Sequence, residues 1–369
     1  MSFDANGEES SGMIDIAVLA GGCSPEHEIS LLSGAQVLHH LDAERFRRWP
    51  VYIDRDGVWW VPDTPYQFAG GDRTADFPTT GLRGLRPGAA LDFLLEQADL
   101  QVVFPALHGP FGEDGTVQGM LDLYGVAYVG SGCAASAVAM DKIRTRECLS
   151  VAGIPMPLAY IPEVPIARAD SAAEAVAIEQ VLGYPCFLKT DVSGSSLGIT
   201  RAETAADVAT FLAEAKSLGR RFMAEAGVLG EEISVPVLGN SGDHLEALPP
   251  VGIYPIGAEF FDYQTKYDPT ACEEIVPPRG LSTGQITEVQ ALALRCHEAL
   301  QCDGLSRTDM IVADTGVVVL EVNTMPGFTP ASLYPQSAAA HGICYADLLF
   351  RLVELALRRP QRTRMEISS

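Results

Sequence analysis

Apolar runs alternate with helical patterns along the first part of the chain. The run IDIAVLAGG (14–22) predicts a buried strand that ends in a tight turn at two glycines. The predicted strands cover 14–22, 48–54, 100–109 and 126–132, the predicted helices cover 24–41 and 115–125, and residues 62–90 are expected to form a loop. Strands that alternate with helices predict an α/β domain with a largely parallel sheet, ending near residue 140.

The rest of the chain predicts a mixture of strands and helices in two parts. A helix from residue 141 leads into Pro155 and Pro157, which suggest a hinge between domains. Further strands are predicted over 183–190, 199–204, 220–227, 231–240 and 247–255, and helices over 207–219, 283–302 and 345–359. Residues 257–280 are rich in aromatic residues without a clear period and suggest a functional loop.

These patterns predict an N-terminal parallel-sheet, Rossmann-like α/β domain followed by a two-part α+β module. The expected divisions are a disordered tail over 1–12, a first domain over 13–140, a central part over 141–235, a C-terminal part over 236–358 and a polar tail over 359–369. We find no internal repeats in the sequence.

Residues 305–330 hold the strongest indication of chemistry. The segments LSRTDMIV and VVVLEVN predict a β-hairpin that turns at Asp314-Thr315-Gly316. A hairpin centred on Thr315 places Asp309 opposite Glu321, with their Cβ atoms about 5 Å apart, so the two carboxylates repel each other. Period two places Arg307 and Asn323 on the same face.

Two interpretations of this hairpin face remain open. Asp, Glu and Asn offer oxygen ligands, which suit Mg²⁺ or Mn²⁺ and not Zn²⁺, and a divalent cation would remove the repulsion. Alternatively, the face is a salt-bridged polar surface in which Arg307 is the counter-ion.

Composition and charge restrict the function classes. The formal net charge of −23 argues against nucleic acid or an anionic membrane surface as a partner. No apolar run reaches the length of a membrane span, and the acidic first twelve residues do not resemble a secretory signal. The eight cysteines form no CxxC pair, so reduced, mostly buried thiols of a cytosolic protein are expected.

Lysine is rare, and its positions suggest a binding site. The chain has only four lysines, at 142, 189, 216 and 266. Lys189 ends a predicted strand before the small-residue loop DVSGSSLG, whose backbone N–H groups can approach phosphate oxygens. Three lysines near such positions suggest a positive pocket for a polyanion such as ATP. The alternatives are a random surface scatter and a simple flexible turn, since the loop matches neither a P-loop nor a dinucleotide fingerprint.

The N-terminal domain offers further candidate residues. The helix over 24–41 is expected to have Ser24 as its N-cap and Pro25 in its first position, with Glu26 in the first turn facing a cleft. The glycines of AGG (20–22) either cradle an anion or serve a steric role in the turn. His108 ends a predicted strand where open α/β sheets bind ligands, with Glu113 beside it, although a structural role for this histidine is the alternative.

Together these features resemble the D-alanine–D-alanine ligase family of the ATP-grasp superfamily. The resemblance covers about residues 14–355. The matching segments, in order, are GGCSPEHEISLLSG, ALHGPFGEDGTVQGMLDLYGVAYVGSG, MDK, GSSLG, FDYQTKY, SRTDMIV and LEVNTMPGFTPASLYP. It implies an ATP-grasp module after the N-terminal domain, a cytoplasmic homodimer, and ligation of two D-alanines for peptidoglycan precursors.

The resemblance implies a nucleotide and metal site. Lys142 and Lys189 would contact the phosphates of ATP, Glu225 would lie beside the adenine and Glu232 would bind the ribose. The implied ATP-binding residues are Lys142, Lys189, Ser195, Ser196, Glu225, Glu232, Phe260, Lys266 and Leu320. The implied ligands of two Mg²⁺ or Mn²⁺ ions are Asp309, Glu321 and Asn323.

The family resemblance also implies how the substrates are held. Glu26 would bind the ammonium of the first D-alanine, and Arg307 with the backbone N–H of Gly327 would stabilise the oxyanion. The implied catalytic residues are Glu26, Ser195, Tyr267, Arg307 and Gly327, and the implied substrate-binding residues are Glu26, His108, Lys266, Arg307, Gly327, Ser332 and Leu333. Ser332 and Leu333 would bind the carboxylate of the second substrate.

Some positions depart from the family pattern. Thr190 and Asp191 stand where relatives usually have Pro and a small or basic residue, and Ala226 stands where many have Lys or Arg. Tyr267 matches dipeptide-forming members, so D-alanine is expected as the second substrate rather than D-lactate. The alternatives are D-serine or a specialised-metabolite amino acid as the second substrate, or a non-catalytic nucleotide-binding protein of the same fold.

Overall fold

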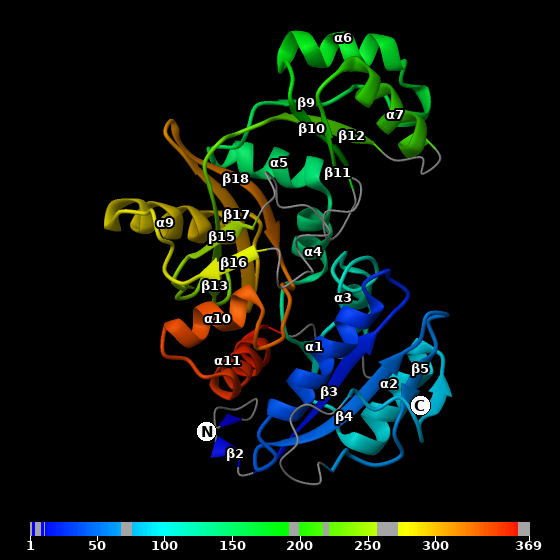
Figure 1. The fold of residues 1–369 in the computed structure, drawn as a ribbon. Helices are drawn as coiled ribbons and strands as arrows, with labels where there is room; N and C mark the ends of the chain where they lie inside the picture. Colours follow the sequence, from blue (N-terminus) through cyan, green and yellow to red (C-terminus); the bar gives the residue numbers. More distant parts are fainter. Residues whose placement is uncertain are drawn as a thin grey trace.

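Among the described residues, a two-stranded sheet near the N-terminus precedes three larger β-sheets that follow one another along the chain (Figure 1). The computed structural model describes residues 2–3, 9–10, 12–67, 76–191, 199–216, 221–256 and 272–360. Within the expected N-terminal tail, β1 (Ser2–Phe3) pairs with β2 (Glu9–Ser10).

The N-terminal sheet is parallel at its centre, as predicted. Its strands are β3 (Ile14–Gly21), β4 (Phe46–Ile53), β5 (Trp59–Val61), β6 (Arg83–Leu85), β7 (Val102–Pro105) and β8 (Ala127–Tyr128). Strand β3 pairs in parallel with β4 and β7, whereas β5 and β6 are added antiparallel at one edge. The helices of this domain are α1 (His27–His40), α2 (Pro87–Ala98) and α3 (Thr116–Tyr124). All eight residues of β3 are buried, because its apolar side chains pack into two core clusters.

The central sheet is antiparallel and has its own apolar core. Its order is β11 (Ile199–Ala202), β10 (Cys186–Thr190), β12 (Phe222–Ala226) and β9 (Ala159–Tyr160). Helices α6 (Ser171–Val181) and α7 (Ala205–Lys216) lie together beside this sheet (Figure 1). Helices α4 (Cys133–Met140) and α5 (Lys142–Val151) connect it to the N-terminal domain.

The C-terminal sheet is also antiparallel. Its main path is β16 (Cys272–Ile275), β15 (Val251–Pro255), β13 (Glu231–Leu238), β17 (Leu305–Ala313) and β18 (Gly316–Asn323), with β14 (Glu246–Ala247) paired to β13. Helix α9 (Thr283–Ala299) packs on this sheet through an apolar cluster. The fold class predicted from the sequence, a parallel-sheet domain followed by two α+β parts, is therefore confirmed.

The first domain and the C-terminal helices share one core. Helices α10 (Leu333–Ala340) and α11 (Tyr345–Arg358) supply Tyr334, Leu348 and Leu352 to the same cluster as Ile16 and Phe104. Because burial of apolar area is the main force that holds elements together, this shared cluster fixes the N-terminal domain against the last part of the chain.

Several predicted elements need correction. Residues 62–90 are not only loop, since β6 and the start of α2 lie there; proline is tolerated in the first turn of a helix, so Pro87 does not prevent it. The predicted loop 257–280 includes β16, and the expected boundary at residue 235 falls inside β13. Of the eight cysteines only three are buried, so the expectation of mostly buried thiols was wrong.

Helix α1 begins at His27, later than predicted. Its N-cap is Glu26 and not Ser24, although the Ser24 hydroxyl accepts a hydrogen bond from the backbone N–H of Glu26 at 3.0 Å. The serine therefore stabilises the turn over Pro25 and Glu26, and Glu26 lies at the N-terminus of the helix.

In the part of the chain that the structure describes, no helix combines the length and apolar character that a membrane span requires.

A buried histidine makes the stability of the C-terminal core depend on pH. His297 of α9 is fully buried, and its Nδ1 lies 2.8 Å from the Ser306 hydroxyl. Burial lowers the pKa of His297 from its ordinary 6.5 to about 4. Between these values the unfolded chain binds a proton that the folded chain does not, so the free energy of unfolding falls as the pH falls.

We expect His297→Gln to be less sensitive to acid than the native chain. The slope of unfolding free energy against pH between about 4 and 6.5 should decrease by up to about 1.4 kcal/mol per pH unit. Urea titrations at a series of pH values would measure it, with the more exposed His341→Gln as control. Equal slopes for the native chain and His297→Gln would contradict the prediction.

Candidate active site

One cavity of about 880 Å³ collects most of the predicted site residues. The predicted residues that line it are Glu26, His108, Lys189, Glu225, Glu232, Arg307, Asp309, Leu320, Glu321, Asn323, Gly327, Ser332 and Leu333. Lys142 lines a small adjoining pocket together with Glu225, Leu320 and Glu321. The other predicted residues, Ser195, Ser196, Phe260, Lys266 and Tyr267, lie outside the described residues.

The hairpin pairs its acidic residues as predicted, but its turn and its register differ from the prediction. Asp309 lies opposite Glu321 and Arg307 opposite Asn323. The turn is tighter than predicted, because Ala313 pairs with Gly316, and an irregularity between Asp309 and Met310 then leaves Leu320 as an extra residue in β18. This β-bulge shifts the register by one residue and restores the predicted pairing.

The bulge decides which side chains reach the cavity. If the register did not shift at the bulge, Asp309 would pair with Leu320, and Glu321 would turn to the opposite face of the sheet. With the bulge, Leu320, Glu321 and Asn323 all line the cavity. β-bulges commonly re-aim side chains next to active sites.

Neighbouring strands add to the same face. Ser234 of β13 lies opposite Asp309 and donates a hydrogen bond from its hydroxyl to Asp309 Oδ1 at 2.5 Å. Glu232, two residues before Ser234, also lines the cavity, as period two requires. Ser234 was not predicted from the sequence, although its alternation with Glu232 was a usable signal.

Arg307 and Asp309 form a buried two-point ion pair. Arg307 Nε lies 2.8 Å from Asp309 Oδ1 and Nη2 lies 2.7 Å from Oδ2. Burial lowers the pKa of Arg307, but the carboxylates of Asp309, Glu321 and Glu113 outweigh it, so the net shift is upward and the guanidinium stays charged. The counter-ion expected from the salt-bridge interpretation is thus present.

The residues whose oxygen atoms could hold a hard cation lie beside one another. The Asn323 amide donates a hydrogen bond from Nδ2 to Asp309 Oδ2 at 3.4 Å, and Glu321 lies opposite Asp309. Over the described ranges, no three His, Cys, Asp or Glu side chains converge into a metal site by themselves. A cation here would therefore need the amide oxygen of Asn323 and oxygen atoms from a ligand.

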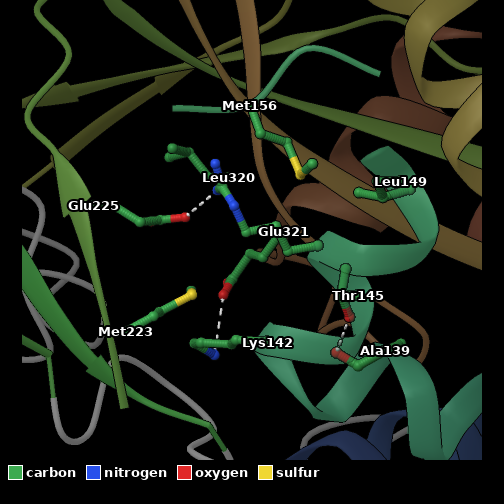
Figure 2. Close-up of a pocket in the computed structure, with 10 residues that line it drawn as sticks. Ala139, Lys142, Thr145, Leu149, Met156, Met223, Glu225, Leu320 and Glu321 are labelled. Carbon is green, nitrogen blue, oxygen red and sulfur yellow. Dashed lines mark hydrogen bonds and ion pairs between the residues drawn. The ribbon is translucent and has the colours of Figure 1, made fainter. Parts of the chain in front are cut away.

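Positive side chains lie at the end of the cavity that is next to β10, β12 and α5. Lys142 Nζ lies 3.4 Å from Glu321 Oε2, and Figure 2 shows the two side chains pointing toward each other. Lys189 Nζ lies 2.5 Å from Glu225 Oε2, and Arg146 Nη1 lies 3.0 Å from Glu225 Oε1. Arg146 was not predicted, but its i, i+4 spacing from Lys142 on a helix places both on one face.

The unusual Asp191 has a counter-ion. Arg221 Nε lies 3.5 Å from Asp191 Oδ2, and Arg221 Nη2 lies 2.8 Å from Asp141, the N-cap of α5. The backbone N–H of Lys142 also donates to the Asp191 carbonyl at 2.9 Å. The negative charge that departs from the family pattern is therefore neutralised by Arg221, which lies only one residue before β12.

The N-terminal end of the cavity holds a buried polar cluster. His108 Nε2 lies 2.9 Å from the Ser33 hydroxyl, and His108 Nδ1 lies 3.3 Å from Glu113 Oε1, so the expected proximity of Glu113 is confirmed. Burial raises the pKa of Glu113, the hydrogen bond to His108 opposes this shift, and the charge of Glu26 adds to it. Gly109 (φ +72°) is required here, because a Cβ would lie 2.6 Å from Glu26 Oε2.

The glycines that end β3 have a steric role. The N–H of Gly21 donates to the Ser30 hydroxyl at 2.8 Å, and the N–H of Gly22 donates to the Ile53 carbonyl at 2.7 Å. A Cβ on Gly21 would lie 2.2 Å from that carbonyl. Both N–H groups are used within the protein, so the steric interpretation of AGG is confirmed and the anion cradle is wrong.

The start of α10 forms the remaining wall. Ser332 is the N-cap of α10, and its hydroxyl lies 2.8 Å from Thr329 Oγ1. Gln336, one helical turn further, donates to Glu274 Oε2 at 2.7 Å. Gln336 and Glu274 line the cavity but were not predicted, since β16 had been interpreted as loop.

Comparisons with known proteins agree with this arrangement. Residues 15–131 match the family described as D-ala D-ala ligase N-terminus, and residues 149–354 match D-ala D-ala ligase C-terminus. A D-alanine–D-alanine ligase of Frankia casuarinae is 41% identical, with 94% of this chain and 97% of the relative covered.

Two solved structures share the fold. The D-alanine–D-alanine ligase of Bacillus anthracis complexed with ATP has a TM-score of 0.71 and 30% identity, covering 94% of this chain and 98% of that one. The VanG D-Ala:D-Ser ligase of Enterococcus faecalis has a TM-score of 0.73 and 29% identity, covering 94% and 100%.

Proposed function

Because the chain belongs to the D-alanine–D-alanine ligase family, we propose that it joins two D-alanines into D-alanyl-D-alanine with consumption of ATP. The product would serve peptidoglycan precursor synthesis. The single observation that supports this proposal best is the cavity, which places Glu26, Lys189, Asp309 and Ser332 around one space. These side chains come from the N-terminal domain, the central sheet, the C-terminal sheet and the start of α10.

ATP would occupy the side of the cavity formed by β10, β12 and β13. Lys142 and Lys189 would bind the phosphates, Glu225 would accept hydrogen bonds from the adenine amino group, and Glu232 would bind the ribose. Leu320 would pack on the base. The resemblance adds Ser195, Ser196, Phe260 and Lys266 to this site. Lysine suits this role because its ammonium is a compact point charge for phosphate.

Asp309, Glu321 and Asn323 would hold Mg²⁺ or Mn²⁺, which suit an all-oxygen ligand set. When bound, such ions would neutralise negative charge on the phosphates of ATP. The fit follows from the paired carboxylates and the adjacent amide, while Lys142 and Arg307 supply the balancing charge in their absence.

The protein would act mainly through positioning and charge. The carboxylate of the first D-alanine attacks the γ-phosphorus of ATP, which gives an acyl phosphate and ADP. Glu26 would hold the ammonium of this substrate, near His108. The amine of the second D-alanine then attacks the acyl carbon, the oxyanion collapses, and inorganic phosphate leaves. Holding the reactants in line supplies much of the rate enhancement.

Arg307 and Gly327 would stabilise the oxyanion of that second step. The bonds from Arg307 to Asp309 use only part of the donors of the guanidinium, and both Arg307 and Gly327 line the cavity. Donors that are already in place cost no reorganisation during the reaction. The N-terminus of α10, at Ser332 and Leu333, would bind the carboxylate of the second substrate through its partial positive charge.

D-Alanine is the proposed second substrate, and Tyr267 supports it by family resemblance. Tyr267 and Ser195 would form a neutral hydrogen-bond network with Glu26. The similarity to a D-Ala:D-Ser ligase favours a second candidate, D-serine, because the shared fold does not distinguish the two. D-Lactate is the least expected of the three.

The ligase assay tests the reaction and the choice of second substrate. We expect phosphate release with ATP, Mg²⁺ and D-alanine, and D-alanyl-D-alanine as the main product when D-alanine, D-serine and D-lactate compete at neutral pH. Coupled phosphate detection and mass spectrometry of the products would measure both. ATP binding without turnover would instead identify a non-catalytic protein. Preferential formation of the ester with D-lactate would refute the prediction that Tyr267 indicates D-alanine as the second substrate.

The metal assignment predicts matched effects of changes on the two strands of the hairpin. Asp309→Asn should lower activity by roughly 100-fold or more, because it removes an anionic ligand. Glu321→Gln should have a similar effect, since it removes the carboxylate opposite Asp309, whereas Leu320→Ala keeps the bulge and the metal ligands. Mn²⁺ binding in the presence of ADP, followed by electron paramagnetic resonance, provides a readout that does not depend on turnover. Unchanged Mn²⁺ binding by Asp309→Asn would support the salt-bridge interpretation.

A cytosolic homodimer is the proposed working state, from family resemblance alone. We expect light scattering to give about twice the chain mass of 39.4 kDa at working concentration. A mass equal to one chain would refute the dimer.

A further inference from the structure

Glu225 lies in a buried group of three charges. It comes from β12, Lys189 comes from β10 and Arg146 comes from α5. Lys189 Nζ lies 2.5 Å from Glu225 Oε2, and Arg146 Nη1 lies 3.0 Å from Oε1, so each carboxylate oxygen has its own cation. The side chains of Glu225 and Arg146 are only 4% and 16% exposed. A buried carboxylate needs such partners to remain charged.

Arg146 is held at both ends. One guanidinium nitrogen pairs with Glu225, and the other donates to the carbonyl of Pro157 in the segment that leads to β9. Burial lowers the pKa of Arg146, and the Glu225 carboxylate opposes that shift. The arginine therefore joins α5, β12 and the chain before β9 at one point.

The two cations differ in what else they can reach. Lys189 lines the large cavity, where it would meet the phosphates of ATP. Arg146 lines the small adjoining pocket of Figure 2, whose walls include Leu149, Met156 and Met223. When Lys189 turns to a phosphate, Arg146 remains beside Glu225. A bound nucleotide would thus draw one cation away from the carboxylate but leave the other.

The second positive charge beside Glu225 comes from a distant part of the chain, and the next residue, Ala226, is uncharged. Arg146 supplies it from a helix that is far away in the sequence, 79 residues from Glu225.

We propose that Arg146 is a positioning residue that holds the Glu225 carboxylate toward the base of the nucleotide, and so selects a base with an amino group at the position of C6 in adenine. The inference rests on the proposed function. An ionised carboxylate accepts hydrogen bonds from the amino group of adenine, whereas guanine presents an oxygen at that position, which a carboxylate repels. Without Arg146, Glu225 would follow Lys189, and this discrimination would weaken.

The test compares ATP with GTP in three variants. Arg146→Gln removes the charge, Arg146→Lys keeps it, and Arg144→Gln changes a residue of the same helix whose side chain is 56% exposed and paired with Glu147. We expect Arg146→Gln to lower the preference for ATP over GTP, measured as the ratio of kcat/KM values, by roughly 10- to 100-fold. The loss should appear in KM for ATP, with KM for D-alanine unchanged. Arg146→Lys should restore most of the preference, and Arg144→Gln should match the native chain.

Binding measurements separate this inference from the ligase function. Calorimetric titration with ATP and with GTP measures the same preference without turnover. The role of Arg146 can therefore be tested even if the chain binds ATP but forms no dipeptide. An unchanged preference in Arg146→Gln would overturn the proposal, as would equal binding of ATP and GTP by the native chain. If Arg146→Gln does not fold, an unaltered preference in Glu225→Gln would overturn it equally.

Discussion

Three carboxylates of the cavity are paired with cations, and the site depends on these ion pairs. The chain has a large excess of acidic residues and few lysines, yet Asp309, Glu225 and Glu321 lie within 4 Å of Arg307, Lys189 and Lys142, respectively. Removing one partner from a buried pair leaves an uncompensated charge, which destabilises a protein more than losing an exposed pair does. Lysine and arginine side chains are also the groups that bind phosphates, so a cavity with these ion pairs suits a polyanion.

Two structural devices place these charges. The bulge at Leu320 sets the register of β18, and as a result Glu321 faces the cavity opposite Asp309. The core that α11 shares with β3 and β7 fixes the N-terminal domain, and with it Glu26 and His108, to the C-terminal sheet. Both act through backbone geometry and apolar packing, which can hold side chains in place with little freedom.

The ends of the cavity differ in their electrostatics. At the nucleotide end, buried carboxylates are balanced by lysine and arginine. At the N-terminal end, Glu26, His108 and Glu113 form a cluster in which burial and the charge of Glu26 raise the pKa of Glu113. The start of α10 adds the partial positive charge of a helix N-terminus on a third side. A substrate with both an ammonium and a carboxylate finds partners of opposite sign at separate points, which fits an amino acid better than a simple anion.

The sequence by itself determined the fold class, the family and the acidic pairing of the hairpin. Alternating apolar patterns are local, and a short hairpin leaves few registers, so Asp309 and Glu321 could be paired from spacing alone, even though the tighter turn and the bulge were missed. Only the tertiary structure decided that Arg146 meets Glu225, that Arg221 neutralises Asp191, and that Gln336 reaches Glu274. These contacts join segments far apart in the chain. Their partners depend on how sheets and helices pack, and periodicity contains no information about that packing.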